Sequence, residues 1–218
     1  MKKLFTKDLP TKNIDYYSSE MKEILEIFPD KVSRVLDVCC GSGIFGRALR
    51  QKGIEVFGIE ENIQAAEIAK KNIDKVIVGD IENIQLDFNE NFFDVIVFAD
   101  VIEHLKDPWT ILEKSRGFLR PKGYFLISIP NIRYYRILLD IIFKGEFNYE
   151  ESGILDIGHL RFFTFKTLLK YLNQLNFKII KHKRNFSGHF SWLLNKLFFD
   201  LFADFFTRQH IIIAQYSK

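Results

Sequence analysis

Three glycines form a turn whose composition and spacing suit the binding of a nucleoside. Gly41, Gly43 and Gly46 come shortly after the predicted strand 32–38 and fit the pattern G-x-G-x-x-G. Between a strand and a helix, such glycines let the backbone turn tightly and approach a ligand beside a helix N-terminus. Glu60 ends the next predicted strand, where a carboxylate can accept hydrogen bonds from ribose hydroxyls. Together these features predict a site for a nucleoside-containing cofactor.

Asp37 distinguishes between two cofactors that use this kind of turn. It lies four residues before Gly41, at the end of the preceding predicted strand. A carboxylate there would repel the dianionic pyrophosphate of NAD, but it suits the ammonium and sulfonium groups of S-adenosylmethionine. The residues therefore favour S-adenosylmethionine, and an NAD-dependent oxidoreductase is the alternative on the same fold.

A second group of polar residues follows the apolar run 93–99. Asp100, Glu103 and His104 fall within one turn at the carboxyl end of that strand, where ligands bind in parallel sheets. A metal ion held there would lower the pKa of an acceptor hydroxyl. Three ligands in one turn do not define a metal site, and we expect no metal.

Two histidines are candidate general bases for an acceptor hydroxyl. One is His104, and the other is His159, which lies just before a predicted helix at 164–175. An imidazole can take a proton near neutral pH. The alternative role of His159 is to hold its own loop in place by hydrogen bonding.

Alternating strands and helices must position these residues. The predicted strands are unbroken apolar runs, and helices separate them, which indicates a parallel sheet covered on both faces. Asn62 and Asp107 are predicted N-caps, and Pro121–Gly123 is a predicted turn. The strands are expected at 32–38, 54–59, 75–78, 93–99 and 124–129, and the helices at 44–51, 64–71 and 107–119.

The rest of the chain flanks this core, and we expect a single domain over 1–218. Its parts are an N-terminal helical segment (1–30, with a helix at 13–28), the cofactor-binding core (31–130), an insertion or lid (131–163) and a C-terminal part (164–218). The C-terminal part is expected to contain a helix at 164–175, an antiparallel hairpin of strands 177–180 and 211–216, and an apolar helix at 191–207. We expect that apolar helix to be buried in the fold or in a homodimer, and the alternative is contact with a membrane or a lipid-linked substrate.

As a set, these motifs resemble the class I S-adenosylmethionine-dependent methyltransferases, in the branch of the glycan- and ubiquinone-pathway enzymes. The resemblance covers residues 30–130 and includes Gly79–Ile81, Phe93–Leu105 and Leu119–Tyr124. It implies an α/β, Rossmann-like, doubly wound sheet, mostly parallel, with an insertion after strand five and S-adenosylmethionine as cofactor. The implied cofactor-binding residues are Asp37, Cys39, Gly41, Ser42, Gly43, Glu60, Glu61, Asp80, Ile81, Ala99 and Asp100.

The expected activity is methyl transfer to a small-molecule, glycan or lipid-linked acceptor, with O-methylation favoured. His104 and His159 are the expected catalytic residues. Besides the oxidoreductase, the alternative is a methyltransferase-like module that binds without turnover.

Composition narrows the choice of partners and compartment. The net charge of +3 over 218 residues gives no reason to expect a nucleic acid. The two cysteines, Cys39 and Cys40, are adjacent and match no metal-finger spacing, which favours a reducing, cytoplasmic compartment. We expect no signal peptide, and no apolar run approaches the length of a membrane span.

Overall fold

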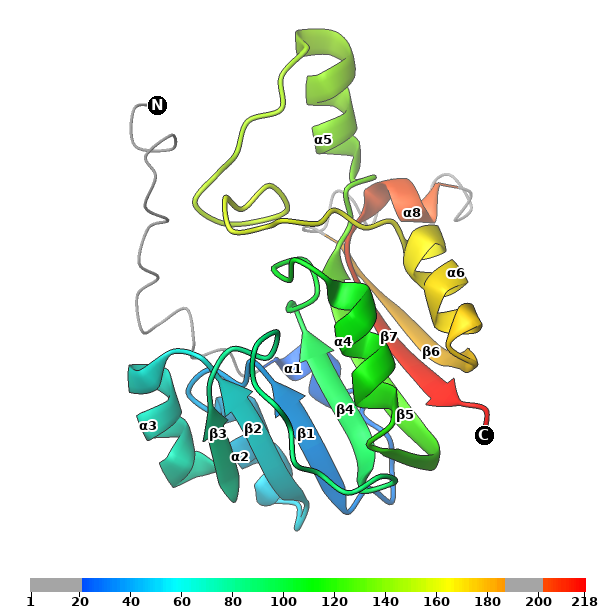
Figure 1. The fold of residues 1–218 in the computed structure, drawn as a ribbon. Helices are drawn as coiled ribbons and strands as arrows, with labels where there is room; N and C mark the ends of the chain where they lie inside the picture. Colours follow the sequence, from blue (N-terminus) through cyan, green and yellow to red (C-terminus); the bar gives the residue numbers. More distant parts are fainter. Residues whose placement is uncertain (1–20, 187–201) are drawn as a thin grey trace.

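The computed structural model describes residues 21–186 and 202–218. They form a seven-stranded sheet in the order β3-β2-β1-β4-β5-β7-β6, in which β1 to β5 run parallel and β7 is antiparallel to both of its neighbours (Figure 1). The α/β, Rossmann-like sheet with an antiparallel C-terminal hairpin is therefore confirmed. The strands are β1 Arg34–Val38, β2 Glu55–Glu60, β3 Lys75–Val78, β4 Phe93–Ala99, β5 Leu119–Pro130, β6 Phe177–Phe186 and β7 Thr207–Tyr216.

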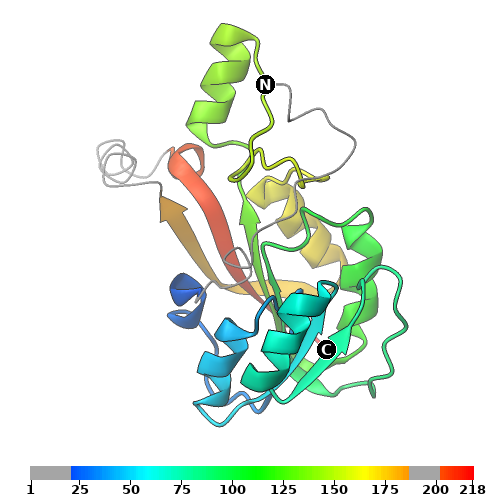
Figure 2. The same cartoon turned by 90° about the vertical axis from the view of Figure 1, so that its left-hand side faces the viewer.

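Helices cover both faces of the sheet. Leu112 of α4 and Leu168 of α6 belong to one apolar cluster, whereas Ile24 of α1, Leu49 of α2 and Ala69 of α3 belong to the other. Figures 1 and 2 show α4 and α6 on one side of the sheet and α1 and α2 on the opposite side. Burial on both faces explains why every residue of β4 is buried. The helices are α1 Lys22–Leu25, α2 Ile44–Arg50, α3 Ile63–Asn72, α4 Pro108–Arg116, α5 Tyr135–Leu139 with its continuation η3 Asp140–Lys144, α6 Phe165–Gln174 and α8 Ala203–Phe206.

Side-chain caps begin three of these helices. The Asn62 side chain accepts from the Ala65 N–H at 3.0 Å, and the Asp107 side chain accepts from the Thr110 N–H at 3.2 Å. Both predicted caps are thus confirmed, and the hydroxyl of Thr164 plays the same part for α6. Each cap satisfies an N–H that has no partner within its helix.

The segment Pro121–Gly123 differs from its prediction as a turn between elements. It lies inside β5 as an irregularity, because Leu119 already pairs with Phe93 before the regular pairing resumes at Tyr124. The helix predicted at 107–119 ends at Arg116 for the same reason. The hairpin strands β6 and β7 are also longer than predicted, since they pair with each other from Phe177 to Phe186.

The two terminal helices are described only in part. Of the helix predicted at 13–28, residues 13–20 lie outside the described residues, and α1 covers 22–25. Of the helix predicted at 191–207, residues 191–201 lie outside them, and α8 covers 203–206. The prediction was wrong at residue 207, because Thr207 already begins β7.

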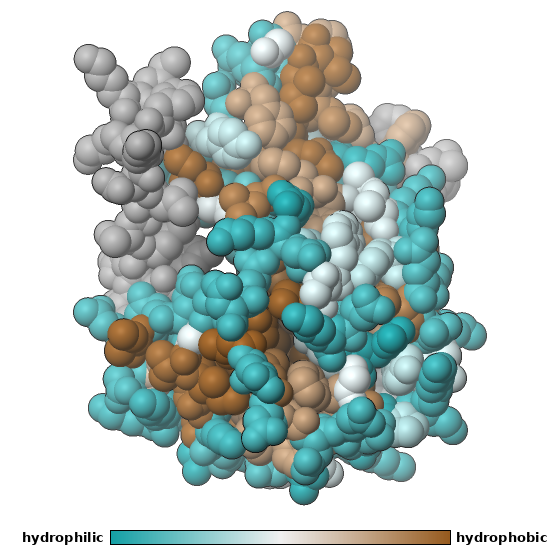
Figure 3. All heavy atoms as spheres, in the orientation of Figure 1, coloured by the Kyte–Doolittle hydropathy of each residue, from teal (hydrophilic) through white to brown (hydrophobic). Residues whose placement is uncertain are grey.

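The insertion after β5 rises from the edge of the sheet as a projecting arm, formed by α5 and η3 (Figure 1). Neither segment has a buried residue. Figure 3 shows apolar side chains gathered on this arm, where Leu139, Ile141, Ile142 and Phe143 are exposed. Within residues 21–186 and 202–218, no helix is long and apolar enough to cross a membrane.

A buried carboxylate joins the starts of the two central strands. Asp94, which is 3% exposed, accepts hydrogen bonds from the backbone N–H groups of Ser33 and Arg34 and pairs with Arg120. It thereby aligns β1 with β4, whose opposite ends carry the predicted site.

We expect Asp94→Ala to lower the free energy of unfolding by about 3 kcal/mol, because it removes a buried carboxylate and leaves Arg120 and the N–H groups of Ser33 and Arg34 without this partner. Chemical denaturation measures this loss. The control is Glu55→Ala, which breaks an exposed ion pair with Arg34 and should cost less than about 1 kcal/mol. Equal losses in the two variants would contradict the role of Asp94.

Candidate functional site

A cavity of about 530 Å³ lies at the carboxyl ends of β1, β2 and β4. Parallel strands end at one edge of a sheet, so turns that are distant in sequence meet there. Eight of the predicted cofactor-binding residues line the cavity: Cys39, Gly41, Glu60, Glu61, Asp80, Ile81, Ala99 and Asp100. The other three, Asp37, Ser42 and Gly43, are not among its lining residues, and their roles stay predictions.

The glycine turn is shaped by left-handed backbone and by close contact with α3. Gly43 has a φ of 73°, and a Cβ atom added to it would lie 3.1 Å from the Cα of Ala69. The side chain of Asn72 donates to the Ser42 carbonyl at 2.7 Å. Ser42 and Gly43 therefore hold the turn against α3, which leaves Gly41 facing the cavity.

Glu60 connects the turn to the end of β2. Its two carboxylate oxygens accept from the backbone N–H groups of Gly41 at 2.9 Å and Asn62 at 2.8 Å. Glu60 is 3% exposed, and burial raises the pKa of its carboxyl. Because each carboxylate oxygen can accept more than one hydrogen bond, Glu60 can also accept from a ligand hydroxyl.

The charge around this cavity is predominantly negative. Among its described lining residues are Glu60, Glu61, Asp80, Glu82 and Asp100, whereas Lys106 is the single lysine and arginine is absent. Behind the turn, burial and then the charge of Glu60 raise the pKa of Asp37 to about 8. Such a site attracts a cationic ligand and repels a pyrophosphate.

Asp80 combines a structural contact with its place in the cavity wall. Its carboxylate accepts from the Glu82 N–H at 2.9 Å and from the Asn83 side chain at 2.6 Å. These contacts fix the turn after β3 and leave Asp80 at the cavity surface.

A second cavity, of about 320 Å³, adjoins the first. Its lining residues come from the end of β4, from the insertion and from the C-terminal hairpin: Asp100, Glu103, His104, Pro130, Ser152, Gly153, Ile154, Asp156, His159, Asn185, Arg208 and Gln209. Asp100 and His104 line both cavities. The arrangement suits two ligands that meet at these residues. Sequence reasoning did not assign Asn185, Arg208 or Gln209 to this site, because no motif or spacing reveals where the hairpin returns.

The two candidate bases have the same orientation toward backbone carbonyls. Nδ1 of His104 lies 3.0 Å from the Gly158 carbonyl oxygen, and Nδ1 of His159 lies 2.9 Å from that of Ile154. A carbonyl can only accept, so Nδ1 is the donor in each neutral ring, and Nε2 has the lone pair that can take a proton. His159 therefore does hold its own loop by hydrogen bonding, and it lines the second cavity as well.

Asp100 is held in place at the junction of the two cavities. The side-chain amide of Gln209 donates to its two carboxylate oxygens at 2.7 and 2.8 Å, and the Ser128 hydroxyl donates to one of them at 2.9 Å. The predicted residue Asp100 thus depends on a partner from β7.

Glu103, His104 and His159 could hold a metal ion, because each offers a ligand atom and these atoms lie within 4.8 Å of one another. Glu103 is fully buried, and burial raises the pKa of its carboxyl well above the usual range, with Asp100 and Asp156 adding to the effect. The expectation that no metal binds stays a prediction.

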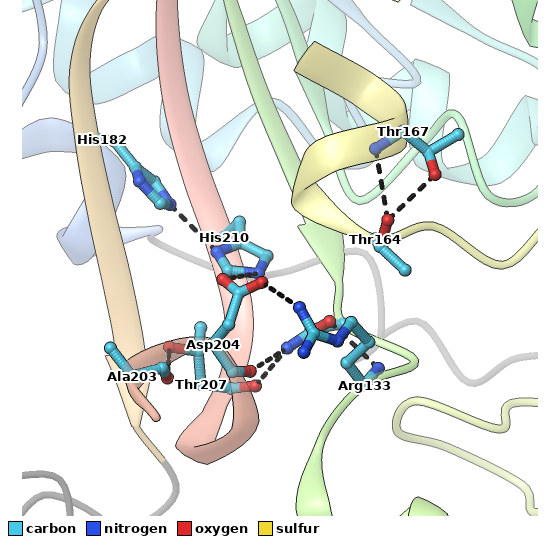
Figure 4. Close-up of polar contacts among 9 residues, drawn as sticks. Arg133, Thr164, Thr167, His182, Ala203, Asp204, Thr207 and His210 are labelled. Carbon is cyan, nitrogen blue, oxygen red and sulfur yellow. Dashed lines mark hydrogen bonds and ion pairs between the residues drawn. The ribbon is translucent and has the colours of Figure 1, made fainter. Parts of the chain in front are cut away.

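A third polar cluster ties the base of the arm to the hairpin (Figure 4). Nε2 of His182 lies 2.9 Å from Nδ1 of the fully buried His210, and His210 faces Asp204 at 3.6 Å. Asp204 in turn accepts from Arg133 at 2.9 Å, just before α5, and the ring of Phe165 stacks on His182. None of these five residues lines either of the two cavities.

Comparison with known proteins agrees with this geometry. A family model described as "Methyltransferase domain" matches residues 11–182. An enzyme named "Ubiquinone biosynthesis O-methyltransferase" from Haemophilus ducreyi is 29% identical over 136 residues, which cover 54% of this chain and 58% of the relative. One of the same name from Actinobacillus pleuropneumoniae is 30% identical, with 50% of each chain covered. The chain thus spans about half the length of these relatives.

Solved structures share the whole fold at low sequence identity. A methyltransferase dependent on S-adenosylmethionine from Archaeoglobus fulgidus aligns with a TM-score of 0.70 and 19% identity, covering 93% of this chain and 94% of its own. Another from Mesorhizobium loti aligns with a TM-score of 0.62 and 17% identity, covering 93% and 100%.

The histidine cluster predicts a pH dependence of stability. Burial, with a smaller contribution from the charge of Arg184, lowers the pKa of both His182 and His210 to about 4. The unfolded chain, with histidine pKa values of about 6.5, binds more protons between these values. Stability should therefore be complete above about pH 6.5 and fall as the pH drops toward 4. In His182→Gln, the loss of unfolding free energy between pH 7 and pH 5 should be smaller than in the wild type. An equal loss in chemical denaturation would contradict this assignment.

Proposed function

Because this chain belongs to the methyltransferase domain family and is a class I S-adenosylmethionine-dependent methyltransferase, we propose that it methylates a hydroxyl group of a small-molecule or glycan acceptor. The observation that carries this proposal is the position of His104. It lines both cavities, and because its Nδ1 donates to a carbonyl, its Nε2 is the ring nitrogen that can accept a proton. An acceptor oxygen held in the second cavity would therefore meet a base beside the methyl donor.

The residues of the first cavity fit S-adenosylmethionine. Its acidic walls and the buried Asp37 suit a ligand that has an ammonium and a sulfonium group, and we assign the ammonium to Asp37. Glu60 has acceptor capacity for the ribose hydroxyls, and Asp80 is our candidate for the adenine amine. The same acidic walls count against an NAD-dependent oxidoreductase, since they would repel pyrophosphate.

In this mechanism the protein aligns the acceptor and removes one proton. When bound, S-adenosylmethionine would supply an electrophilic methyl group, and the neutral thioether S-adenosylhomocysteine would be its leaving group. His104 takes the hydroxyl proton on Nε2, and Asp100, fixed by Gln209 and Ser128, lines both cavities beside it. His159 also lines the second cavity, in which the acceptor would bind. Alignment and exclusion of water then provide most of the rate enhancement.

Two observations bear on the acceptor. The relatives' names specify O-methylation, although the matched part covers only about half of each relative. The exposed apolar side chains of the arm lie on the insertion that also lines the acceptor cavity, which suits a lipid-linked acceptor. The segment 191–207, whose apolar residues suit the same contact, lies mostly outside the described residues.

Asp37 should make cofactor binding pH-dependent. With a pKa of about 8, its carboxyl must lose a proton before it can pair with the ligand's ammonium. The affinity for S-adenosylhomocysteine should therefore rise between pH 6 and pH 7.5, by nearly tenfold per pH unit. Asp37→Asn should bind at least about tenfold more weakly at pH 7.5 and lose this dependence. Calorimetric titration measures both, and an unchanged pH profile in Asp37→Asn would remove Asp37 from the cofactor site.

His104 and His159 should differ in their effect on turnover. We expect His104→Gln to lower kcat by about a hundredfold or more, because the proton acceptor is lost. The S-adenosylhomocysteine affinity should change little. His159→Gln is the matched variant and should lower kcat less. The reverse order would assign the base to His159.

A screen of acceptors tests the proposed reaction. Phenols, glycosides and lipid-linked sugars would be incubated with S-adenosylmethionine, and products analysed by mass spectrometry and NMR. A methyl ether as product supports the proposal. Methylation confined to nitrogen or carbon would overturn it while leaving the cofactor assignments intact.

A further inference from the structure

Glu103 is the one buried acid in the described part of the chain whose two carboxyl oxygens both lack a hydrogen-bond partner. Its backbone carbonyl accepts from the N–H groups of Leu160 and Arg161 at 2.8 and 2.9 Å, which fixes the residue between β4 and the insertion. Its side chain is fully buried, and neither carboxyl oxygen has a hydrogen-bond partner among the described residues. Buried polar groups are almost always paired, so an unpaired carboxyl at this position has a physical cause.

The side chains around Glu103 are two histidines and two other acids of the second cavity. Glu103 lines the second cavity, and a carboxyl oxygen lies within 4.8 Å of ring nitrogens of His104 and His159. The other two acids of that cavity already have donors, since Asp100 accepts from Gln209 and Asp156 accepts from the Gly158 N–H at 2.7 Å. Among the three acids that line the second cavity, Glu103 is therefore the one whose carboxyl can still form its hydrogen bonds with a ligand.

We propose that Glu103 recognises the acceptor by binding a second hydroxyl, adjacent to the one that is methylated. This inference rests on the proposed function and names its substrate class, an acceptor with neighbouring hydroxyl groups. His104 takes the proton from one hydroxyl, and Glu103 forms a hydrogen bond with the other. A saturated sugar ring and an aromatic diol share this chemistry. An acceptor without the second hydroxyl would leave Glu103 buried and unpaired, so it would bind more weakly.

Protein stability tests the first half of this inference without any acceptor. An unpartnered buried carboxyl destabilises the folded protein, so Glu103→Leu should raise the melting temperature by about 2 °C or more. Asp156→Leu is the matched control, an acid in the same cavity that has a backbone partner, and it should lower the melting temperature. Loss of folding or a lower melting temperature in both Glu103→Leu and Glu103→Gln would overturn the inference, because it would show an internal partner.

Ligand binding tests the second half. Catechol and cis-1,2-cyclohexanediol should each be compared with phenol and cyclohexanol by thermal shift, in the presence of S-adenosylhomocysteine. One diol should stabilise the wild type more than its mono-alcohol, and which pair shows this identifies an aromatic or a saturated acceptor. Glu103→Leu should lose the difference while keeping its affinity for S-adenosylhomocysteine. A preference that persists in Glu103→Leu, or its absence from both pairs in the wild type, would overturn the inference.

Metal binding and cofactor binding are measured on the same variants. If Mg²⁺, Mn²⁺ or Zn²⁺ alone raises the melting temperature of the wild type but not of Glu103→Leu, the carboxyl binds a metal ion and the inference fails. If the wild type does not bind S-adenosylhomocysteine, the proposed function fails first, and the stability of Glu103→Leu still decides whether the carboxyl is unpaired.

Discussion

The parallel pairing of β1, β2 and β4 is the constraint on which every proposed role depends. Parallel strands end at the same edge, so Gly41, Glu60 and Asp100, which are far apart in sequence, come together around one cavity. Asp94 helps to set this alignment at the opposite ends of β1 and β4. Because Asp100 begins a turn directly after β4, the same edge also orients His104 toward the second cavity.

The buried acids of the site differ in how the protein satisfies them. Glu60 is held by two backbone N–H groups and therefore supports the turn even without a ligand. Asp37 has a raised pKa, and Glu103 has no partner among the described residues. A buried acid with a raised pKa or without a hydrogen-bond partner makes the folded protein less stable. In proteins such groups are typical of functional sites, where a bound ligand can supply the missing partner. Because of this contrast, we assign a ligand to Asp37 and Glu103 and a dual role to Glu60.

Local signals in the sequence predicted the core well. The strand limits of β3 and β4, the caps Asn62 and Asp107, and the glycine turn follow from neighbouring residues, and the structure agrees. The acceptor side could not be predicted in the same way. Gln209 reaches Asp100 because β7 returns beside β5, and that placement is set by tertiary pairing across 109 residues. Likewise, the pairing of Leu119 with Phe93 draws Pro121–Gly123 into β5, which no turn signal reveals.

A crystal structure of the complex with S-adenosylhomocysteine tests the central claim most directly, namely that the two ligands meet at His104. We predict ribose hydroxyls on Glu60, the ammonium group on the side of Asp37, and the thioether sulfur beside Asp100 and His104, facing the second cavity. A sulfur atom that faces away from His104, or a ribose that makes no contact with Glu60, would contradict it.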